Sequence, residues 1–188
     1  LLNIGLNFNL LIKIWFSDWP YNPLEYIFGV DILYLAGISI LVISVLKLLK
    51  KQEAVFALIL AVLVLVLTAF MNQKLMVPER NYIFPFIAGA WSWSYFPLFP
   101  WLAYPLIGFA FFFWEEKIIH FFSNLKILTY ILLSAIGILI LSFAKWGFES
   151  TIKLESYYHH TFLYSLWALG IIILWILFLR LLLQKFPA

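Results

Sequence analysis

Long runs of apolar residues, broken by few charged positions, predict membrane-spanning helices along the chain. Five runs are long enough to cross the roughly 30 Å hydrocarbon core of a bilayer as α-helices. We place these spans at Leu24–Leu49, Ala54–Met71, Leu98–Trp114, Ile127–Ala144 and Phe162–Leu183. Leu1–Phe16 predicts a partial N-terminal helix. The runs are continuously apolar rather than alternating, so they predict an all-α, polytopic transmembrane helix bundle and exclude a transmembrane β-barrel.

Two connections between the spans are long, Asn72–Pro97 and Lys145–His160. The first contains the apolar stretch "YIFPFIAGAW", which is too short to span and predicts a re-entrant or interfacial segment over a cavity. No repeat and no long linker is visible, so we expect residues 1–188 to form a single transmembrane domain. The chain begins with Leu1, inside an apolar run, and we expect it to be a fragment of a longer membrane protein.

Composition agrees with a membrane protein and narrows its chemistry. The 188 residues are 65% hydrophobic and 11% charged, whereas soluble domains are about half apolar and a quarter charged. The net charge of +3 comes from cations scattered at helix ends, which does not predict nucleic-acid binding. The absence of cysteine excludes thiolate catalysis and cysteine-based zinc sites, and we expect no metal cofactor.

Lysine and arginine near the helix ends give a weak indication of orientation. One set of connections carries Lys47, Lys50, Lys51, Lys117, Lys126, Arg180 and Lys185, and the opposite set carries Lys13, Lys74, Arg80, Lys145 and Lys153. The bias of seven against five predicts that "KLLKKQE" and "EEKIIHFFSNLK" face the cytoplasm. Both long connections would then face outward.

Asp31 is the candidate polar site within a predicted span. A carboxylate at mid-bilayer costs roughly 2.5–3.5 kcal/mol on insertion scales, so we expect Asp31 to face protein, water or a ligand. The alternative is that it lies near the outer end of the span and contacts headgroup water. Glu115 directly follows the third full span and is most simply its solvated end.

Three further side chains in the outward connections could bind a substrate. His159 and His160 precede the last span, and one of them could act as a general base or hydrogen-bond a substrate. Adjacent helical residues point about 100° apart, which disfavours a shared metal; the alternative is a capping role. Arg80 could bind an anionic or sugar group, or pair with the neighbouring Glu79.

Three prolines at the start of one predicted span indicate a bent helix. Pro97 keeps the preceding chain extended, and Pro100 suits a first helical turn. Pro105 removes the hydrogen bond to the carbonyl of Trp101 and predicts a kink there. Because a freed carbonyl in lipid must find a donor, we expect Trp101 to line a polar cavity.

The same segment carries a family resemblance. "YFPLFPWLAYPLIGFAFF" (Tyr95–Phe112) resembles the "FPLLPWLG…LLG" segment of the heparan-α-glucosaminide N-acetyltransferase catalytic family of multi-pass membrane acyltransferases. "VDILYLAGISILVISVL" (Val30–Leu46) is similar to its "iLQxIGlxxLl" span, with Tyr34 replacing the usual Gln, and "YYHHTFLYSLWALG" (Tyr157–Gly170) resembles a late span. In the first segment the agreement covers Phe96, Pro97, Leu98, Pro100, Trp101, Leu102 and Gly108, while Ala103 stands where Gly is common.

The resemblance implies an integral membrane acyltransferase, in a bacterial inner membrane, that takes an acyl group from acyl-CoA, acetyl-CoA in particular. The acceptor would be a sugar hydroxyl or an amine, as a small molecule or a glycan, and a homodimer is left open. The family's essential histidine lies N-terminal to the matching region, so the catalytic residues are unknown here. The substrate-binding candidates are Asp31, Arg80, Trp101, His159 and His160. The alternatives are a transporter or flippase-like permease, and a non-catalytic membrane subunit.

Overall fold

The computed structural model describes residues 28–74, 82–89, 91–124 and 127–185, with residues 12, 15, 16, 22, 24 and 25. Most of the predicted partial helix Leu1–Phe16, and Arg80, lie outside the described residues. The helices are α4 (Ile32–Lys47), η1 (Lys50–Gln52), α5 (Glu53–Lys74), η2 (Phe84–Phe86), α6 (Leu98–Trp101), α7 (Ala103–Asn124), α8 (Ile127–Ser142), α9 (Ala144–Ile152), α10 (Leu154–Tyr158) and α11 (Phe162–Lys185). No strand occurs in this part of the chain beyond an isolated bridge between Val30 and Ser94, so the predicted all-helical class is confirmed.

The predicted number of five full spans is not confirmed. Three helical stretches among the described residues are long and apolar enough to cross a membrane, Lys50–Met71, Leu98–Phe121 and Phe162–Arg180. The helices α8 and α9 bend by 50° at their junction and make a fourth span only if the bent pair is counted as one. With 16 residues, α4 falls short of the length that a span requires.

The predicted start of the first full span, Leu24–Leu49, is wrong, because α4 begins at Ile32. Just before it, Val30 donates its N–H to the carbonyl of Trp93 (2.9 Å) and accepts from the N–H of Tyr95 (2.9 Å). These bonds hold residue 30 in a parallel bridge with Ser94, outside the helix. The backbone of Val30 is therefore hydrogen-bonded to the loop that precedes α6 and is not part of the helix.

Small residues bring α5 and α7 together in the centre of the bundle. Ala57 and Ala61 on α5 and Ala103 on α7 are fully buried, as is Leu106. Spacings of three and four residues place each pair on one helix face. Because lipid is as apolar as a leucine side chain, close van der Waals packing of small residues is what associates such helices. The same core takes in residues of α4 and α11.

The loop between α5 and α6 is folded tightly against the helix starts. The hydroxyl of Ser94 donates to the carbonyl of Pro85 (2.6 Å), and the N–H of Phe99 donates to the carbonyl of Ile87 (2.9 Å). Both Ser94 and Pro85 are buried. Gly89 has a φ of 97°, in the left-handed region that favours glycine, and a β-carbon there would overlap the Trp91 ring. In the described part of this loop, the carbonyls of Pro85 and Ile87 thus have hydrogen-bond donors from within the loop and α6.

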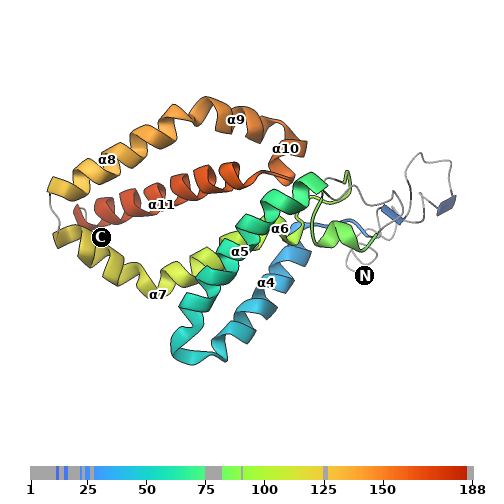
Figure 1. The fold of residues 1–188 in the computed structure, drawn as a ribbon, viewed down its shortest axis with the longest axis horizontal. Helices are drawn as coiled ribbons and strands as arrows, with labels where there is room; N and C mark the ends of the chain where they lie inside the picture. Colours follow the sequence, from blue (N-terminus) through green and yellow to red (C-terminus); the bar gives the residue numbers. More distant parts are fainter. Residues whose placement is uncertain are drawn as a thin grey trace.

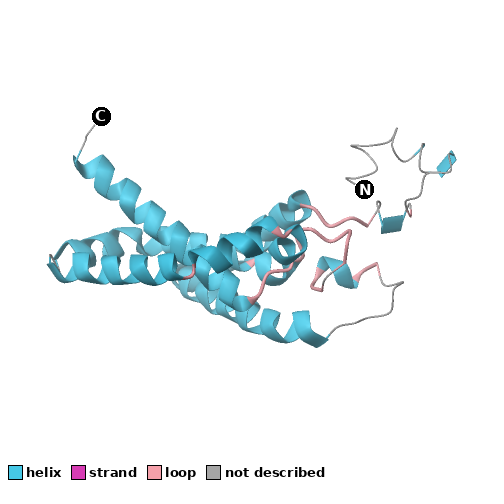
Figure 2. Ribbon diagram, turned by 90° about the horizontal axis from the view of Figure 1, so that it is seen from above, coloured by secondary structure: helices cyan, strands magenta, loops and turns pink. Residues whose placement is uncertain are grey.

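The helices group on two sides of α7 (Figure 1). On one side lies the α4–α5 hairpin, and on the other α8 and α9 form an arch over α11. Seen from above, the C-terminal part of α11 diverges from the other helices (Figure 2). There Arg180 forms an ion pair with Glu115 of α7, whose side chain is 19% exposed. The expectation that Glu115 follows the end of a span is thus wrong, because its charge is paired and α7 continues to Asn124.

Candidate functional site

The proline-rich junction between the loop and α7 sets the geometry of the candidate site. Pro97 is the extended residue before α6 (φ −61°, ψ 159°), and Phe99 is non-helical (φ −99°, ψ 118°) before a cis peptide bond to Pro100. The predicted kink at Pro105 is misplaced. Pro105 lies in the first turn of α7, where a backbone N–H has no partner within the helix, and the irregular backbone lies earlier, at Phe99.

Trp101 and Tyr104 project from this junction three residues apart, a spacing that puts them on one face. The indole N–H of Trp101 donates to the carbonyl of Tyr158 (2.8 Å). Its ring meets those of Tyr157 and His160 edge-on, with centroids 5.4 Å and 4.8 Å away. Trp101 thus joins the start of the α6–α7 span to the connection between α10 and α11.

His160 is the buried centre of this cluster. Its side chain is 2% exposed, and both ring nitrogens have partners. Nδ1 lies 2.7 Å from the carbonyl of Tyr157, and Nε2 lies 2.9 Å from the hydroxyl of Tyr104. Since a carbonyl only accepts, Nδ1 carries the proton and Nε2 accepts from Tyr104. The two contacts fix one tautomer of a neutral imidazole.

Burial also determines the charge of His160. Removing the ring from water disfavours the imidazolium and lowers the pKa of His160 from 6.5 to about 4. The hydrogen bond to the Tyr157 carbonyl acts in the opposite direction, and the neighbouring His159 lowers the pKa further. His160 is therefore neutral at physiological pH, with a basic nitrogen directed at a tyrosine hydroxyl.

The cluster continues through Tyr164 to α9. The Tyr164 ring lies 4.8 Å from that of His160, and its hydroxyl is 2.8 Å from the hydroxyl of Thr151. Thr151 in turn donates to the carbonyl of Gly147 (2.8 Å). Tyr164 is buried and Thr151 is half-buried. The result is a hydrogen-bonded aromatic cluster between the first turns of two membrane-length helices.

The structure brings together only part of the predicted site. Trp101 contacts His160 directly, and His159 is the half-buried preceding residue, in a turn rather than on a helix. Asp31 has a different set of hydrogen-bond partners. Its carboxylate caps α4 by accepting from the N–H groups of Leu33 (2.9 Å) and Tyr34 (3.3 Å). The expectation that Asp31 sits within a span is therefore corrected: it is the residue before the helix, where capping is its evident role.

Tyr104 and Tyr164 are the site residues that the sequence did not single out. The available signal was weak. Tyr104 follows Trp101 by three residues, and Tyr164 follows His160 by four. Neither spacing indicates a contact between chain segments that are 56 residues apart, which is the separation of Tyr104 and His160.

The fold and the cluster define an α-helical membrane protein in which a buried histidine is hydrogen-bonded to a half-buried tyrosine where two long helices begin. A family model described as "Heparan-alpha-glucosaminide N-acetyltransferase, catalytic" matches residues 8–122, more than half of the 188-residue chain. The chain belongs to this family. The match covers the segments around Asp31 and Trp101, whereas His159 and His160 lie beyond it. Comparisons with curated proteins and with solved structures gave no match.

Proposed function

We propose that the protein is a membrane acetyltransferase that transfers an acetyl group from acetyl-CoA to a hydroxyl or amine of a sugar acceptor. The observation that carries this proposal is the family match over residues 8–122, which includes the proline junction and Trp101. A bacterial inner membrane, with acetyl-CoA supplied from the cytoplasm, is the setting we propose. The bilayer is then the protein's permanent partner.

The aromatic cluster supplies the groups that acyl transfer needs. Trp101, Tyr104 and Tyr157 are partly exposed, whereas His160 lies buried behind them. We assign Trp101 and Tyr104 to acceptor binding. As the acceptor oxygen or nitrogen attacks the acetyl carbonyl, its proton passes to the Tyr104 hydroxyl while the Tyr104 proton passes to Nε2 of His160. The bond from carbon to the sulfur of coenzyme A breaks, and the imidazolium returns its proton through the Tyr104 hydroxyl to the leaving thiolate.

The lowered pKa of His160 keeps the imidazole neutral at physiological pH and makes its protonated form a stronger acid. A neutral imidazole is ready to accept at physiological pH, and an imidazolium buried there returns its proton readily. Asp31, His159 and Arg80 remain proposed contacts for the polar parts of the substrates. Of these, Asp31 would contribute through the second oxygen of its carboxylate, since one oxygen accepts both helix N–H groups.

The test is acetyl transfer from labelled acetyl-CoA to a panel of sugars and amines, in proteoliposomes that contain the full-length protein. We expect transfer by the wild type and a loss of at least tenfold in Trp101→Phe, which keeps an aromatic ring but loses the N–H donor. Trp175→Phe is the matched control, because Trp175 is 60% exposed and lies toward the other end of α11. Substrate uptake by the wild type without any acetyl transfer would refute the proposal and favour a transporter.

A further inference from the structure

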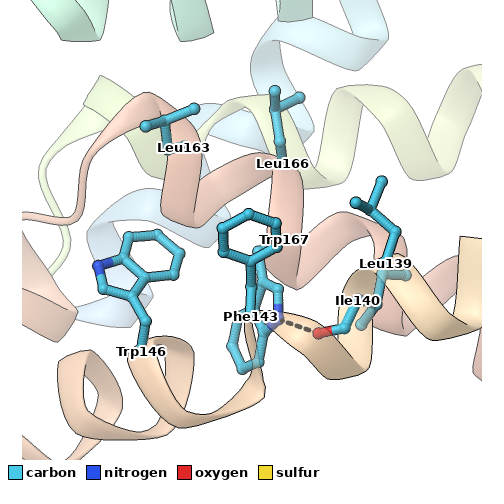
Figure 3. A pocket seen from close by; sticks show the side chains of 7 residues that line it. All are labelled: Leu139, Ile140, Phe143, Trp146, Leu163, Leu166 and Trp167. Carbon is cyan, nitrogen blue, oxygen red and sulfur yellow. Dashed lines mark hydrogen bonds between the residues drawn. The ribbon is translucent and has the colours of Figure 1, made fainter.

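An apolar cavity of about 620 Å³ lies between the α8–α9 arch and α11. Figure 3 shows its lining, with Phe143 and Trp146 on one wall and Leu163, Leu166 and Trp167 on the other. Leu139 and Ile140 complete it. The 50° bend at Phe143 turns α9 away from the axis of α8, and the cavity occupies the inside of this elbow. It is separated from His160 by Tyr164, whose ring contacts both Trp146 and Trp167.

Water does not suit this cavity. At about 30 Å³ per molecule its volume would take about 20 waters, each requiring two to four polar partners. The lining is leucine, isoleucine, phenylalanine and tryptophan. The indole N–H of Trp167 already donates to the carbonyl of Ile140 (3.1 Å), and the ring nitrogen of Trp146 points away from the other lining residues (Figure 3). An apolar group therefore suits the cavity better than water does.

The occupant must also be narrow. A helix with its side chains is at least 10 Å across, so even two turns of about 11 Å would take about 850 Å³. The cavity is smaller than that. An unfilled hollow, in turn, would leave the lining atoms without van der Waals partners on one side. A single flexible hydrocarbon chain meets both conditions.

The cavity opens sideways, toward the region where such chains are found. Leu139, Phe143 and Leu163 on its rim are 60%, 53% and 66% exposed. Leu163 and Leu166 belong to the first turns of the membrane-length stretch Phe162–Arg180, and Leu139 to the apolar α8. Trp146 lies in the first turn of α9 and Trp167 in the second turn of α11, and tryptophan is enriched at membrane interfaces. A bilayer around these helices would place acyl chains against the exposed rim of the cavity.

We propose that this cavity is a lipid site that holds one acyl chain of a membrane phospholipid, with the headgroup outside, beside α9. Lipid tails and the lining are equally apolar, so burial from water contributes nothing to this binding. Binding instead depends on the fit of the acyl chain to the cavity. The bound lipid still exchanges with lipid of the surrounding bilayer.

The test uses the full protein in vesicles of phosphatidylcholine that include a phosphatidylcholine with a photoreactive diazirine in one acyl chain. Cross-linked peptides are quantified by mass spectrometry. We expect labelling of the cavity residues to exceed labelling of Leu41, a lipid-accessible position of α4 that is 62% exposed. In Leu166→Trp, which fills the cavity, we expect cavity labelling to fall at least fivefold. Ile173→Trp, which introduces the same bulky residue two turns along α11, should leave it unchanged.

Two results would overturn the lipid site. The first is equal labelling of the cavity residues and of Leu41 in the wild type, which needs no variant and so stands even if Leu166→Trp does not fold. The second is cross-linking of a second copy of the chain at Leu166, when a photoreactive amino acid is placed there, because it would make the cavity part of a subunit interface. None of these measurements requires acetyl-CoA or an acceptor, so the lipid site is tested independently of the proposed transferase activity.

Discussion

The buried neutral state of His160 gives a quantitative prediction for stability against pH. The pKa of His160 is about 4 in the folded protein and 6.5 for an unperturbed histidine. Because the folded state binds the proton more weakly, its stability is fully present above pH 6.5 and is lost as the pH falls toward 4. The difference of about 2.5 pKa units corresponds to about 3 kcal/mol, at about 1.4 kcal/mol per unit.

The measurement is the free energy of unfolding in mixed micelles, titrated with a denaturing detergent between pH 4 and pH 7.5. We expect the wild type to lose about 3 kcal/mol more than His160→Gln over this interval, since glutamine has no proton to bind. His120→Gln, a change on the exposed surface of α7, should follow the wild type. Equal pH slopes for the wild type and His160→Gln would refute the reasoning, as would a His160 titration near pH 6.5 by nuclear magnetic resonance.

Two packing predictions follow from close approaches between helices. Gly147→Ala should destabilise the protein by about 1–3 kcal/mol, because a β-carbon there would overlap the Trp167 ring. Gly137→Ala is the control, because a β-carbon there has open space. Thermal unfolding compares the two variants, and equal melting temperatures would contradict the contact between Gly147 and Trp167. Ala61→Leu should cost about 1–3 kcal/mol by forcing α5 and α7 apart, and the exposed Ala36→Leu should cost little in the same detergent titration.

The helical class could be predicted because it follows from local information. A run of apolar residues in a bilayer must satisfy its backbone hydrogen bonds within itself, so it forms a helix whatever its neighbours are. The stretch that holds α5 illustrates this, since its predicted bounds, Ala54–Met71, lie within the helix Glu53–Lys74. Local information also identified the proline junction, whose residues are unusual in any helix.

The predictions that were wrong concern positions whose structure depends on residues distant in the sequence. Asp31 was expected inside a span because the apolar run begins at Leu24. The hydrogen bonds that Val30 donates to Trp93 and accepts from Tyr95 instead delay the start of α4 to Ile32. The span was expected to end before Glu115 because the charged residues Glu115, Glu116 and Lys117 follow its apolar run. Arg180, on another helix, forms an ion pair with Glu115.

In the candidate site, too, some features follow from the local sequence and others from contacts between distant segments. The sequence singled out Trp101 and His160 separately, from a motif and from side-chain chemistry. Their contact, the tautomer of His160 and its burial all come from the meeting of the α6–α7 junction with the α10–α11 connection. Tyr104 is recognisable as part of the site only after that meeting is known.

The rate of acetyl transfer in a His160→Gln variant is the most direct test of the account, because it links the buried imidazole to the proposed chemistry. General acid–base groups contribute about 10²- to 10⁴-fold to a rate. We therefore predict that His160→Gln lowers single-turnover transfer from labelled acetyl-CoA at least 100-fold at pH 7, while His120→Gln keeps the wild-type rate. A His160→Gln protein that is folded and transfers acetyl groups as fast as the wild type would contradict it.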